Sequence, residues 1–443
     1  MYKPVEVVEV MAWGFRVGAV SLNTNTGYYI FEYDSKWIPR GIELSPFNMP
    51  VSQPLIQKSF SFPSLSIDTF KRLPAMLADA LPDKFGNALI DAALSDEGVP
   101  KESITSLDRL AYMSNRGMGA IEFRPTRGPK KKSSTAINLA LLVEGARNVL
   151  EGKFDGDKET EVAIRNIIQV GISAGGARAK AVIAWNPITK KIRSGQMQTE
   201  DGFEHWLLKL DGVGQDLALG SSAHYGRIEY AYYLMAGAAG IDMMESTLLE
   251  ENGRAHFMTK RYDRNGNAKH HAQTLCAMKH LDFNMIGVHS YNQYFEAILG
   301  LNLNDEAMKE GFRRMVFNVL ASNCDDHSKN FSFLLKQGGK WELTPAYDIT
   351  HAHNPDNQWT KQHLMSVNGK FYNITRKDFM VIADLFLIQD ANEIIKVVTD
   401  AIKRWREFAN EAKLPIEEQF RIEADFKYIS KSVKTNQLTS SIT

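Results

Sequence analysis

Three polar residues in the last third of the chain have the types and the spacing that phosphoryl transfer requires. Four residues separate Asp325 from Asn330, and a second acid, Asp348, follows a short distance further on. In protein kinases an acid accepts the proton of the attacking hydroxyl, while an amide and a carboxylate bind magnesium beside the transferred phosphate. Asp325 is therefore predicted as the base, with Asn330 and Asp348 as metal ligands. The usual His-Arg-Asp and Asp-Phe-Gly sequences are missing, so the spacing predicts at most a divergent kinase.

The residues between Asn330 and Asp348 are expected to form a β-hairpin that brings these two side chains together. Residues 331–335 and 341–344 have the composition of strands, and residues 336–340 contain the two adjacent glycines of a turn. In a simpler alternative, Asp325 and its neighbour form a turn and Asp348 caps another element. The hairpin favours the metal-binding interpretation over that alternative.

Lys209 stands at the end of an apolar run, residues 206–210, that is typical of a strand. An ammonium group is costly to bury unless it is paired. In a kinase such a lysine holds the α- and β-phosphates of ATP and is oriented by a glutamate of the next helix. Glu229, on the helix predicted for residues 225–237, is the expected partner, and Glu245 is the second choice. The simpler alternative is a lysine that reaches solvent from a strand end.

A loop of small residues precedes the strand predicted at residues 181–185, and we expect it to bind the nucleotide. Small side chains let backbone N–H groups approach phosphate oxygens closely. The loop consists of Ser173, Ala174, Gly175, Gly176, Ala177, Arg178, Ala179 and Lys180. Residues 171–175 also match the G-x-S-x-G elbow of α/β-hydrolases, but that elbow must lead into a helix, whereas a strand is predicted here. A plain turn rich in glycine and alanine is the third alternative.

Histidine and cysteine add little to the predicted chemistry. No second ligand stands at a metal-binding spacing from His327 or His271, and His327 is expected instead to orient the catalytic loop. Cys324 is expected to be a buried small residue rather than a nucleophile. The chain has only two cysteines, too few for a disulfide framework or a zinc site, which favours a reducing cytoplasm.

Composition describes an ordinary globular protein. The 443 residues predict two or three domains, and 44% hydrophobic with 23% charged residues are typical of chains with sizeable cores. Basic and acidic residues both number 52, which argues against a chain whose main task is to coat nucleic acid. We find no signal-peptide core and no apolar run near the ~20 residues that span a bilayer, so a cytoplasmic location without membrane contact is expected.

Three regions are predicted along the chain. Residues 1–125 should form a β-rich N-terminal subdomain, residues 126–262 a small ATP-binding lobe, and residues 263–443 a mostly helical lobe with the catalytic loop. The predicted fold class is α+β, a divergent protein-kinase-like two-lobed fold with an accessory subdomain. The expected strands are residues 5–12, 16–21, 27–33, 121–123, 167–172, 181–185 and 206–210, and the expected helices are residues 69–78, 87–94, 135–151 and 225–237.

Several motifs in combination resemble those of the HipA family, the serine/threonine-kinase toxins of bacterial toxin–antitoxin pairs. Four of them are the loop at 173–180, Thr-Lys-Arg-Tyr-Asp-Arg at 259–264, the segment 323–330 and the Tyr-Asp pair at 347–348. Two more, Leu-Pro-Asp-Lys-Phe-Gly at 81–86 and Arg-Gly-Met-Gly-Ala at 116–120, look like the family's N-terminal subdomain. The resemblance covers nearly the whole chain.

The resemblance implies ATP and Mg²⁺ as ligands and a serine or threonine of a protein as phosphate acceptor. By position, Asp325 matches the family's catalytic base, Asn330 and Asp348 its metal ligands, and Lys209 its phosphate-binding lysine. Ser173 matches the serine that these kinases autophosphorylate, a modification that silences the enzyme in the family. A phosphoserine adds about −1.5 to −2 charges where the phosphates of ATP would bind.

The resemblance also implies a helix-turn-helix antitoxin as partner, with DNA contacted only through that partner. The best-understood family members act on an aminoacyl-tRNA synthetase, which is a candidate substrate here. In the nucleotide loop, Arg178-Ala179-Lys180 stands where some members carry Gln-Glu-Lys, so the lysine is retained while its neighbours differ.

Spacing alone suggests that Lys329, between His327 and Asn330, lies near the transferred phosphate, and these residues complete the predicted catalytic loop. Two alternatives from other classes stay open. One is a catalytically silent co-repressor bound to an antitoxin on DNA, against which the intact set of base, metal ligands and lysine counts. The other is a small-molecule phosphotransferase of the same fold, because acceptor choice depends on surfaces that the sequence does not reveal.

Overall fold

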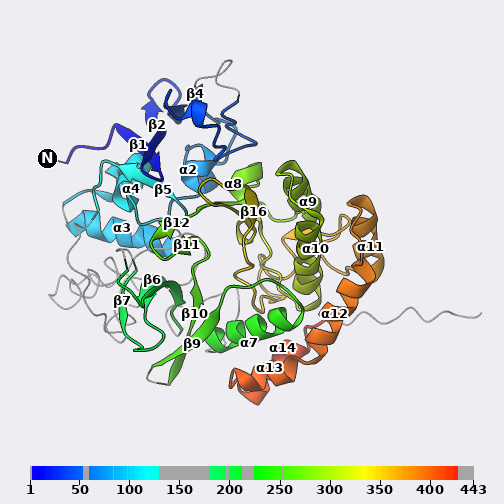
Figure 1. Cartoon of the computed structure of the whole chain (residues 1–443). Coiled ribbons are helices and arrows are strands. Elements are labelled where there is room, and N and C mark those ends of the chain that lie inside the picture. The colour runs from blue at the N-terminus through cyan, green and yellow to red at the C-terminus, as the bar shows by residue number, and fades with distance from the viewer. Residues whose placement is uncertain are drawn as a thin grey trace, which may run out of the picture.

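The chain folds around two five-stranded β-sheets and a group of helices, which Figure 1 shows as the blue-to-cyan, green and yellow-to-red parts of the ribbon. The structure is a computed structural model of the whole chain. It describes residues 2–52, 59–82, 84–96, 98–128, 179–195, 199–211, 224–251 and 253–427. No helix within these ranges is both long enough and apolar enough to cross a membrane.

The first sheet lies in the N-terminal region and is antiparallel, with the strand order β4-β3-β2-β1-β5. Its strands are β1 (Val7–Ala12), β2 (Phe15–Asn23), β3 (Tyr28–Tyr33), β4 (Ser59–Phe60) and β5 (Ile121–Arg124). Val8 and Val10 are fully buried whereas Val7 is half exposed, the alternation of a strand with one face on the core. The strands predicted from the sequence in this region are confirmed.

The turn between β1 and β2 reaches across to the C-terminal region. Trp13 and Gly14 both have positive φ, 50° and 81°, as a tight two-residue hairpin turn requires. The indole Nε1 of Trp13 donates a hydrogen bond of 2.8 Å to the carbonyl oxygen of Lys269. The N-terminal sheet is therefore tied to residues that follow the second sheet.

Short helices cover the first sheet. They are α1 (Ile67–Phe70), α2 (Ala75–Ala78), α3 (Lys84–Asp96) and α4 (Ser106–Met113), with the 3-10 turns η1 (Ile38–Arg40) and η2 (Lys101–Ser103). The single helix predicted for residues 69–78 is wrong. Lys71 and Arg72 adopt φ of 53° and 64°, and Pro74 fixes an extended entry, so the chain ends α1 and begins α2 anew.

The second sheet has the order β7-β6-β8-β10-β9 and is also antiparallel. Its strands are β6 (Lys180–Trp185), β7 (Ile192–Ser194), β8 (Glu204–Lys209), β9 (Ser246–Glu251) and β10 (Arg254–Lys260). The long helix α7 (Tyr225–Ala238) packs on β10 so closely that a Cβ on Gly226 would lie 1.9 Å from the carbonyl oxygen of Ala255. The strands expected at 181–185 and 206–210 and the helix expected at 225–237 are confirmed. The strand expected at 167–172 and the helix expected at 135–151 lie outside the described residues.

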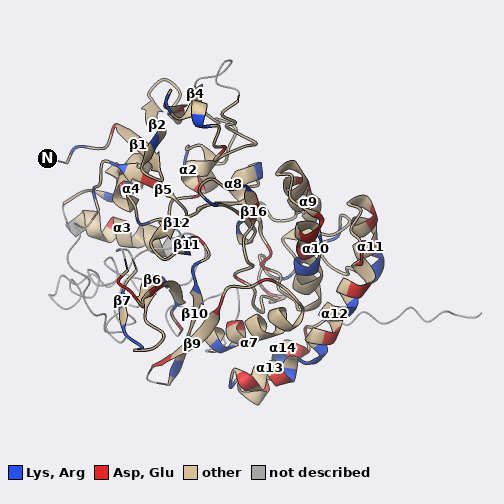
Figure 2. Ribbon diagram, viewed as in Figure 1, with Lys and Arg blue, Asp and Glu red and all other residues tan. Residues whose placement is uncertain are grey.

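The C-terminal region carries the remaining elements. Its strands are β11 (Arg264–Asn265), β12 (Ala268–Lys269), β13 (His271–Thr274), β14 (His289–Ser290), β15 (Ser332–Leu335), β16 (Trp341–Leu343) and β17 (Met365–Ser366). Its helices are α8 (Leu275–Lys279), α9 (Tyr291–Gly300), α10 (Asp305–Leu320), the 3-10 turn η3 (Ser328–Asn330), α11 (Arg376–Leu385), α12 (Ala391–Lys403), α13 (Trp405–Glu411) and α14 (Ile416–Glu423). Figure 2 shows acidic and basic residues interspersed along α11 to α14.

The predicted hairpin after Asn330 is confirmed, because β15 and β16 pair antiparallel around a turn at residues 336–340. The hairpin gains a third strand, β13, which the sequence did not predict, and which pairs with β15 from His271–Leu335 to Thr274–Ser332. The expectation of a mostly helical chain from residue 263 onward is wrong up to residue 290, where strands β11 to β14 outnumber the single helix α8. From α9 onward the expectation holds.

Two buried apolar clusters support this architecture. One joins the N-terminal sheet to the second sheet, since Val10 and Phe31 belong to the same cluster as Ile183 and Trp206. The other fills the helical lobe around Tyr294, Phe317 and Trp405. The accessory subdomain and the small lobe thus share one core, and the helical lobe has its own.

Candidate functional site

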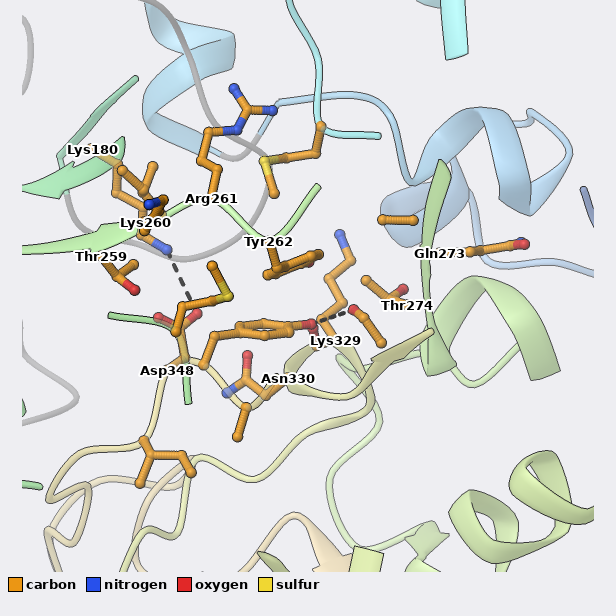
Figure 3. Close-up of a pocket in the computed structure, with 18 of the residues that line it drawn as sticks. Lys180, Thr259, Lys260, Arg261, Tyr262, Gln273, Thr274, Lys329, Asn330 and Asp348 are labelled. Carbon is orange, nitrogen blue, oxygen red and sulfur yellow. Dashed lines mark hydrogen bonds and ion pairs between the residues drawn. The ribbon is translucent and has the colours of Figure 1, made fainter. Parts of the chain in front are cut away.

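A pocket between the second sheet and the helical lobe collects most of the residues predicted to carry chemistry (Figure 3). We call it the interlobe pocket and define it by Lys180, Lys209, Glu229, Asn330 and Asp348, which all line it. These side chains come from β6, β8, α7, η3 and the segment after β16. Segments far apart in the sequence therefore converge on one cavity.

Lys209 is the last residue of β8, and its side chain points into the interlobe pocket rather than to solvent. Its Nζ is ion-paired with Glu229 of α7 and with Asp348, and its side chain is only 9% exposed. Burial alone would lower the pKa of Lys209, but the carboxylates of Asp348 and Glu229 raise it above its usual value. The ammonium is consequently held charged at the centre of the pocket.

Glu229, not Glu245, is the partner of Lys209. Glu229 is 3% exposed and lies on the face of α7 that packs on the sheet. Glu245 precedes β9, has a side chain that is 64% exposed, and approaches Lys260 at 4.0 Å. The first choice of the sequence analysis therefore makes the contact, and the second choice does not.

Asp348 is surrounded by positive charge. Lys180 at the start of β6 has its Nζ 3.7 Å from Asp348 Oδ2, and Lys209 contacts Oδ1. Figure 3 shows Lys180 facing Asp348, with Asn330 and Lys329 on neighbouring segments. Burial alone would raise the pKa of Asp348, but Lys180 and Lys209 together hold it well below its usual range. Asp348 also adopts φ of 52°, a conformation that costs energy for a residue with a Cβ and that clusters at functional sites.

Asp325 and Asn330 are joined by the backbone of the predicted catalytic loop. The amide Nδ2 of Asn330 donates a 2.7 Å hydrogen bond to the carbonyl oxygen of Asp325. The side chain of Asp325 is 43% exposed, and its Oδ1 lies 3.8 Å from Nε2 of His327. His327, Lys329 and Asn330 line the interlobe pocket, whereas Asp325 is not among its lining residues and is held beside them by its contacts with His327 and Asn330.

A buried network of hydrogen bonds below the predicted catalytic loop holds the loop in place. This network was not predicted from the sequence. Asp326 accepts hydrogen bonds from the backbone N–H of Leu364 at 2.7 Å and from the hydroxyl of Tyr291 at 2.8 Å. Its Oδ2 also lies 3.0 Å from Nδ1 of His363. Burial alone would lower the pKa of His363, but Cys324 and Asp326 raise it well above its usual value. A second acid directly after Asp325 in the sequence could have indicated this network.

The rear wall of the interlobe pocket comes from the accessory subdomain. Asp79, directly after α2, accepts hydrogen bonds from the backbone N–H and the hydroxyl of Thr274 at 2.7 and 2.8 Å. Burial raises the pKa of Asp79, and the charge of Lys329 opposes that shift. The ammonium of Lys329 lies 4.6 Å from the centre of the Phe283 ring. Nothing in the local sequence around Asp79 marks it as a pocket residue.

Two tyrosines close the space between the small lobe and the catalytic loop. Tyr262 and Tyr347 stack with ring centres 5.7 Å apart. The hydroxyl of Tyr347 donates a 2.7 Å hydrogen bond to the carbonyl oxygen of Lys329 and also contacts Ser332. Two of the sequence motifs, at 259–264 and at 347–348, are therefore in direct contact beside the predicted metal ligands.

The motifs at 116–120 and 259–264 form a second contact, which we call the clasp and define by Gly117, Gly119, Arg261, Asp263 and Arg264. Asp263 is fully buried and receives Nε and Nη2 of Arg261 at 2.9 and 2.7 Å, together with Nη1 of Arg264. The backbone N–H of Gly119 donates to the same carboxylate at 2.7 Å, and both guanidinium groups donate to the carbonyl oxygen of Gly117. Burial alone would raise the pKa of Asp263, but Arg261 and Arg264 hold it well below its usual range.

The available ligands suit a magnesium ion that binds together with a nucleotide better than a metal ion bound by protein side chains alone. The amide oxygen of Asn330 and the ionised carboxylate of Asp348 are hard oxygen ligands, and Mg²⁺ in nucleotide sites commonly takes one or two such ligands plus substrate phosphates. Within the described residues there is no group of three or more His, Cys, Asp or Glu side chains able to hold a metal ion. The residues present would suit an ion that arrives together with a nucleotide.

Only residues 179 and 180 of the predicted nucleotide loop are among the described residues. Ser173, Ala174, Gly175, Gly176 and Ala177 lie outside the described residues, so their predicted roles stay predictions. The loop leads into β6, as expected, and its last residue Lys180 is described above.

The two sheets, the helical lobe and the interlobe pocket define an α+β protein with two lobes and a β-rich accessory subdomain. The particular family follows from family models. Residues 8–124 match the model of the HipA N-terminal domain, and residues 172–406 match that of the HipA-like C-terminal domain. The second match alone covers more than half of the chain, and the chain therefore belongs to the HipA family.

A solved structure is consistent with this fold. A chain in the complex of the Shewanella oneidensis toxin–antitoxin proteins HipA and HipB with operator DNA is similar over 94% of both chains, with a TM-score of 0.65 and 17% identity. At that identity the similarity concerns the fold alone. The Helicobacter pylori proinflammatory kinase CtkA matches 50% of this chain and 88% of its own, at 14% identity and a TM-score of 0.32, too low to support an argument.

Proposed function

We propose that the protein is an ATP-dependent serine/threonine protein kinase and the toxin of a toxin–antitoxin pair. The observation that carries the proposal is the convergence of Lys209, Glu229 and Asp348 in the pocket that Asn330 also lines. A lysine held by a glutamate of the next helix, beside an acid and an amide from a loop and hairpin, is the arrangement that phosphoryl transfer uses. A catalytically silent protein has no chemical need for this set.

In the proposed reaction the hydroxyl oxygen of the acceptor attacks the γ-phosphorus of ATP while the bond from that phosphorus to the bridging oxygen breaks. The hydroxyl proton passes to the carboxylate of Asp325, and ADP leaves with the electron pair of the broken bond. The partly exposed position of Asp325 suits an acceptor on another protein, because a protruding side chain can reach it.

The remaining residues orient the phosphates and offset their charge. Lys209 and Lys180 are assigned to the phosphates, with Glu229 holding Lys209 in position. Asn330 and Asp348 would hold Mg²⁺, which supplies neutralisation of the charge that develops on the phosphates. When a nucleotide binds, its phosphates would replace Asp348 as the partner of the two ammonium groups.

The regulatory part of the proposal rests on the family and on the loop at 173–180. Ser173 is proposed as an autophosphorylation site, because it matches the serine that the family phosphorylates. A phosphate there would repel the phosphates of ATP and so inhibit the enzyme. A HipB-like antitoxin with a helix-turn-helix is the proposed partner, since the Shewanella complex contains HipA, HipB and operator DNA. An aminoacyl-tRNA synthetase is the first substrate to test.

The test is the intact mass of the protein, with site mapping, after incubation with Mg-ATP. We expect one added phosphate at Ser173 in the wild type and none in Asp325→Asn. A chain that binds ATP but gains no phosphate would favour the silent co-repressor or a partner-dependent enzyme. Transfer to small hydroxyl compounds but not to proteins in a cell extract would favour a small-molecule phosphotransferase. Absence of ATP binding would overturn the proposal.

A further inference from the structure

A second pocket lies where the accessory subdomain meets the small lobe, separate from the pocket that holds the predicted catalytic residues. We call it the junction pocket; its charged lining consists chiefly of Arg116, Glu122, Arg261, Arg264 and Lys269. The turn at Trp13 and the side chains of His205, His270 and Lys336 also line it. The empty space inside it, including the mouth open to solvent, is about 1380 Å³, which is ample for a small molecule.

Positive charge exceeds negative charge around this space. Arg261 and Arg264 share the single carboxylate of Asp263, and Lys269 pairs with Glu122 at 2.6 Å. Arg116 has no carboxylate partner among the described residues. Among the described residues these four cations face two carboxylates, and Lys336, which also lines the pocket, is paired with Glu342, so an excess of two positive charges remains.

Arg116 is the cation whose hydrogen bonds are least satisfied. Its Nε donates to the carbonyl oxygen of Met113 at 3.2 Å, and its guanidinium lies 4.9 Å from the centre of the Tyr112 ring. Its Nη2 is buried and has no hydrogen-bond partner in the described part of the chain. The guanidinium thus has hydrogen-bonding capacity that no described residue uses, although Nη2 itself lies against Gly128.

Burial and neighbouring cations lower the pKa values of several groups in the junction pocket. Burial and the neighbouring Arg261 lower the pKa of Arg264 to about 10. Burial lowers the pKa of Lys269, and Arg264 and Arg261 add to this against the opposing effect of Glu122. His205 follows the same pattern, since burial, Arg261 and Arg264 lower its pKa to about 4. Burial is the largest cause of each of these pKa shifts, and the neighbouring cations add to it, as expected where positive charge is in excess.

We propose that the junction pocket binds a phosphate group, either as inorganic phosphate or as the phosphate ester of a small molecule. Two excess positive charges match a phosphate dianion, and guanidinium groups bind phosphate oxygens through paired N–H donors. The side-chain amides of Asn115, Asn267 and Gln337 also line the pocket and offer neutral polar contacts for the rest of an ester. This site is distinct from the proposed ATP site, although Arg261 borders both pockets.

The proposal is tested by calorimetric titration of inorganic phosphate into the full chain, first with the interlobe pocket filled by Mg²⁺ and a non-hydrolysable ATP analogue. We expect saturable binding of one phosphate. Lys269→Gln and Arg116→Gln should each weaken it by about tenfold, the effect of losing one charged hydrogen bond. Glu122→Gln should strengthen it, because it removes one of the two carboxylates. Lys396→Gln, on the exposed face of α12, is the matched control and should bind like the wild type.

Tighter phosphate binding by Glu122→Gln cannot arise from misfolding. This variant therefore distinguishes loss of the binding site from loss of the folded structure. A parallel titration with glycerol 3-phosphate separates the two sources: tighter binding of the ester than of phosphate assigns an ester ligand, and equal or weaker binding assigns free phosphate. Absence of saturable binding to the wild type, or equal affinity in the wild type and in folded Lys269→Gln and Glu122→Gln, would overturn the proposal. If no nucleotide binds, the titration is run without it, and the same variants still report on the junction pocket alone.

Discussion

Lys209 illustrates how one side chain decides the character of the site. A lysine at the end of an apolar strand has two options, to extend into solvent or to find carboxylates inside. Here it finds two, Glu229 from the next helix and Asp348 from a segment 139 residues further along the chain. The ion pair with Glu229 is nearly dry, since the two side chains are 9% and 3% exposed. That geometry makes Glu229 an orienting residue for Lys209.

We predict that Glu229→Gln lowers kcat/KM for ATP by about 10- to 100-fold, because a charged hydrogen bond worth about 1.5–3 kcal/mol is weakened. Glu245→Gln is the matched control, since this glutamate is largely exposed and its ion pair with Lys260 spans 4.0 Å. It should change kcat/KM by less than about twofold, as weak surface pairs do. Equal losses in both variants would contradict the assignment of Glu229.

At the scale of elements, the predicted catalytic loop is held by a buried network beneath it in addition to its own hydrogen bonds. Asp325 and Asp326 are neighbours in different environments. The side chain of Asp325 is 43% exposed, whereas Asp326 is 1% exposed in a network with Tyr291, His363 and Leu364. The network joins the loop to α9 and to the segment before β17. The position of Asp325 is therefore set by the partners of Asp326.

His363→Gln is predicted to lower kcat by about tenfold while changing KM for ATP little, because the loop would shift but the lysines proposed to bind phosphate would not. The change leaves Asp326 without its cationic partner, which removes a buried ion pair. Steady-state kinetics measure both constants. His353→Gln serves as control, since His353 is 20% exposed and approaches Asp425 outside the loop. A rise in KM without a fall in kcat would exclude the positioning role.

The same ion pair predicts a pH dependence of stability. The pKa of His363 is raised in the folded chain above the ordinary value of about 6.5, so the pair stabilises the fold fully below about pH 6.5. The stabilisation is lost as the pH rises through the raised pKa. The thermal midpoint of the wild type should exceed that of His363→Gln at pH 6, and the gap should narrow as the pH is raised. A gap that stays constant with pH would count against a charged His363.

At the scale of the whole molecule, the accessory subdomain is part of the site rather than an appendage. It shares one apolar core with the small lobe, supplies Asp79 to the rear wall of the interlobe pocket, and closes the clasp through Gly117 and Gly119. Gly119 has φ of +80°, and a Cβ there would lie 3.1 Å from the backbone nitrogen of Ala272. The turn at 116–120 therefore needs glycine in order to reach Asp263.

Asp263→Asn is predicted to lower the free energy of unfolding by about 3 kcal/mol or more, because it leaves two buried guanidinium groups with a neutral partner. Chemical denaturation followed by tryptophan fluorescence measures the change. Asp356→Asn, in an exposed loop of the helical lobe, is the matched control and should have little effect. Equal stability of both variants would show that the clasp does not hold the subdomain.

Local patterns in the sequence were sufficient for features whose cause lies within a few residues. The hairpin at 331–344 follows from apolar runs around two glycines, and the strand that ends at Lys209 follows from its apolar composition. The same reasoning failed at residues 69–78, where the apolar spacing suggested one helix and two residues with positive φ divide it. The conformations of Lys71 and Arg72 depend on packing that a periodic pattern does not contain.

The tertiary structure alone decided several of the contacts between charged residues. Sequence spacing predicted that Asn330 and Asp348 would come together, and Glu229 was correctly preferred over Glu245. Sequence spacing did not predict that Asp79 lines the pocket or that Asp326 is the centre of a buried network. Nor did it predict that Asp263 binds two arginines and a turn that lies about 140 residues earlier in the chain. Such contacts join segments whose separation is set by the folding of whole sheets, and no local preference of either segment encodes the distance between them.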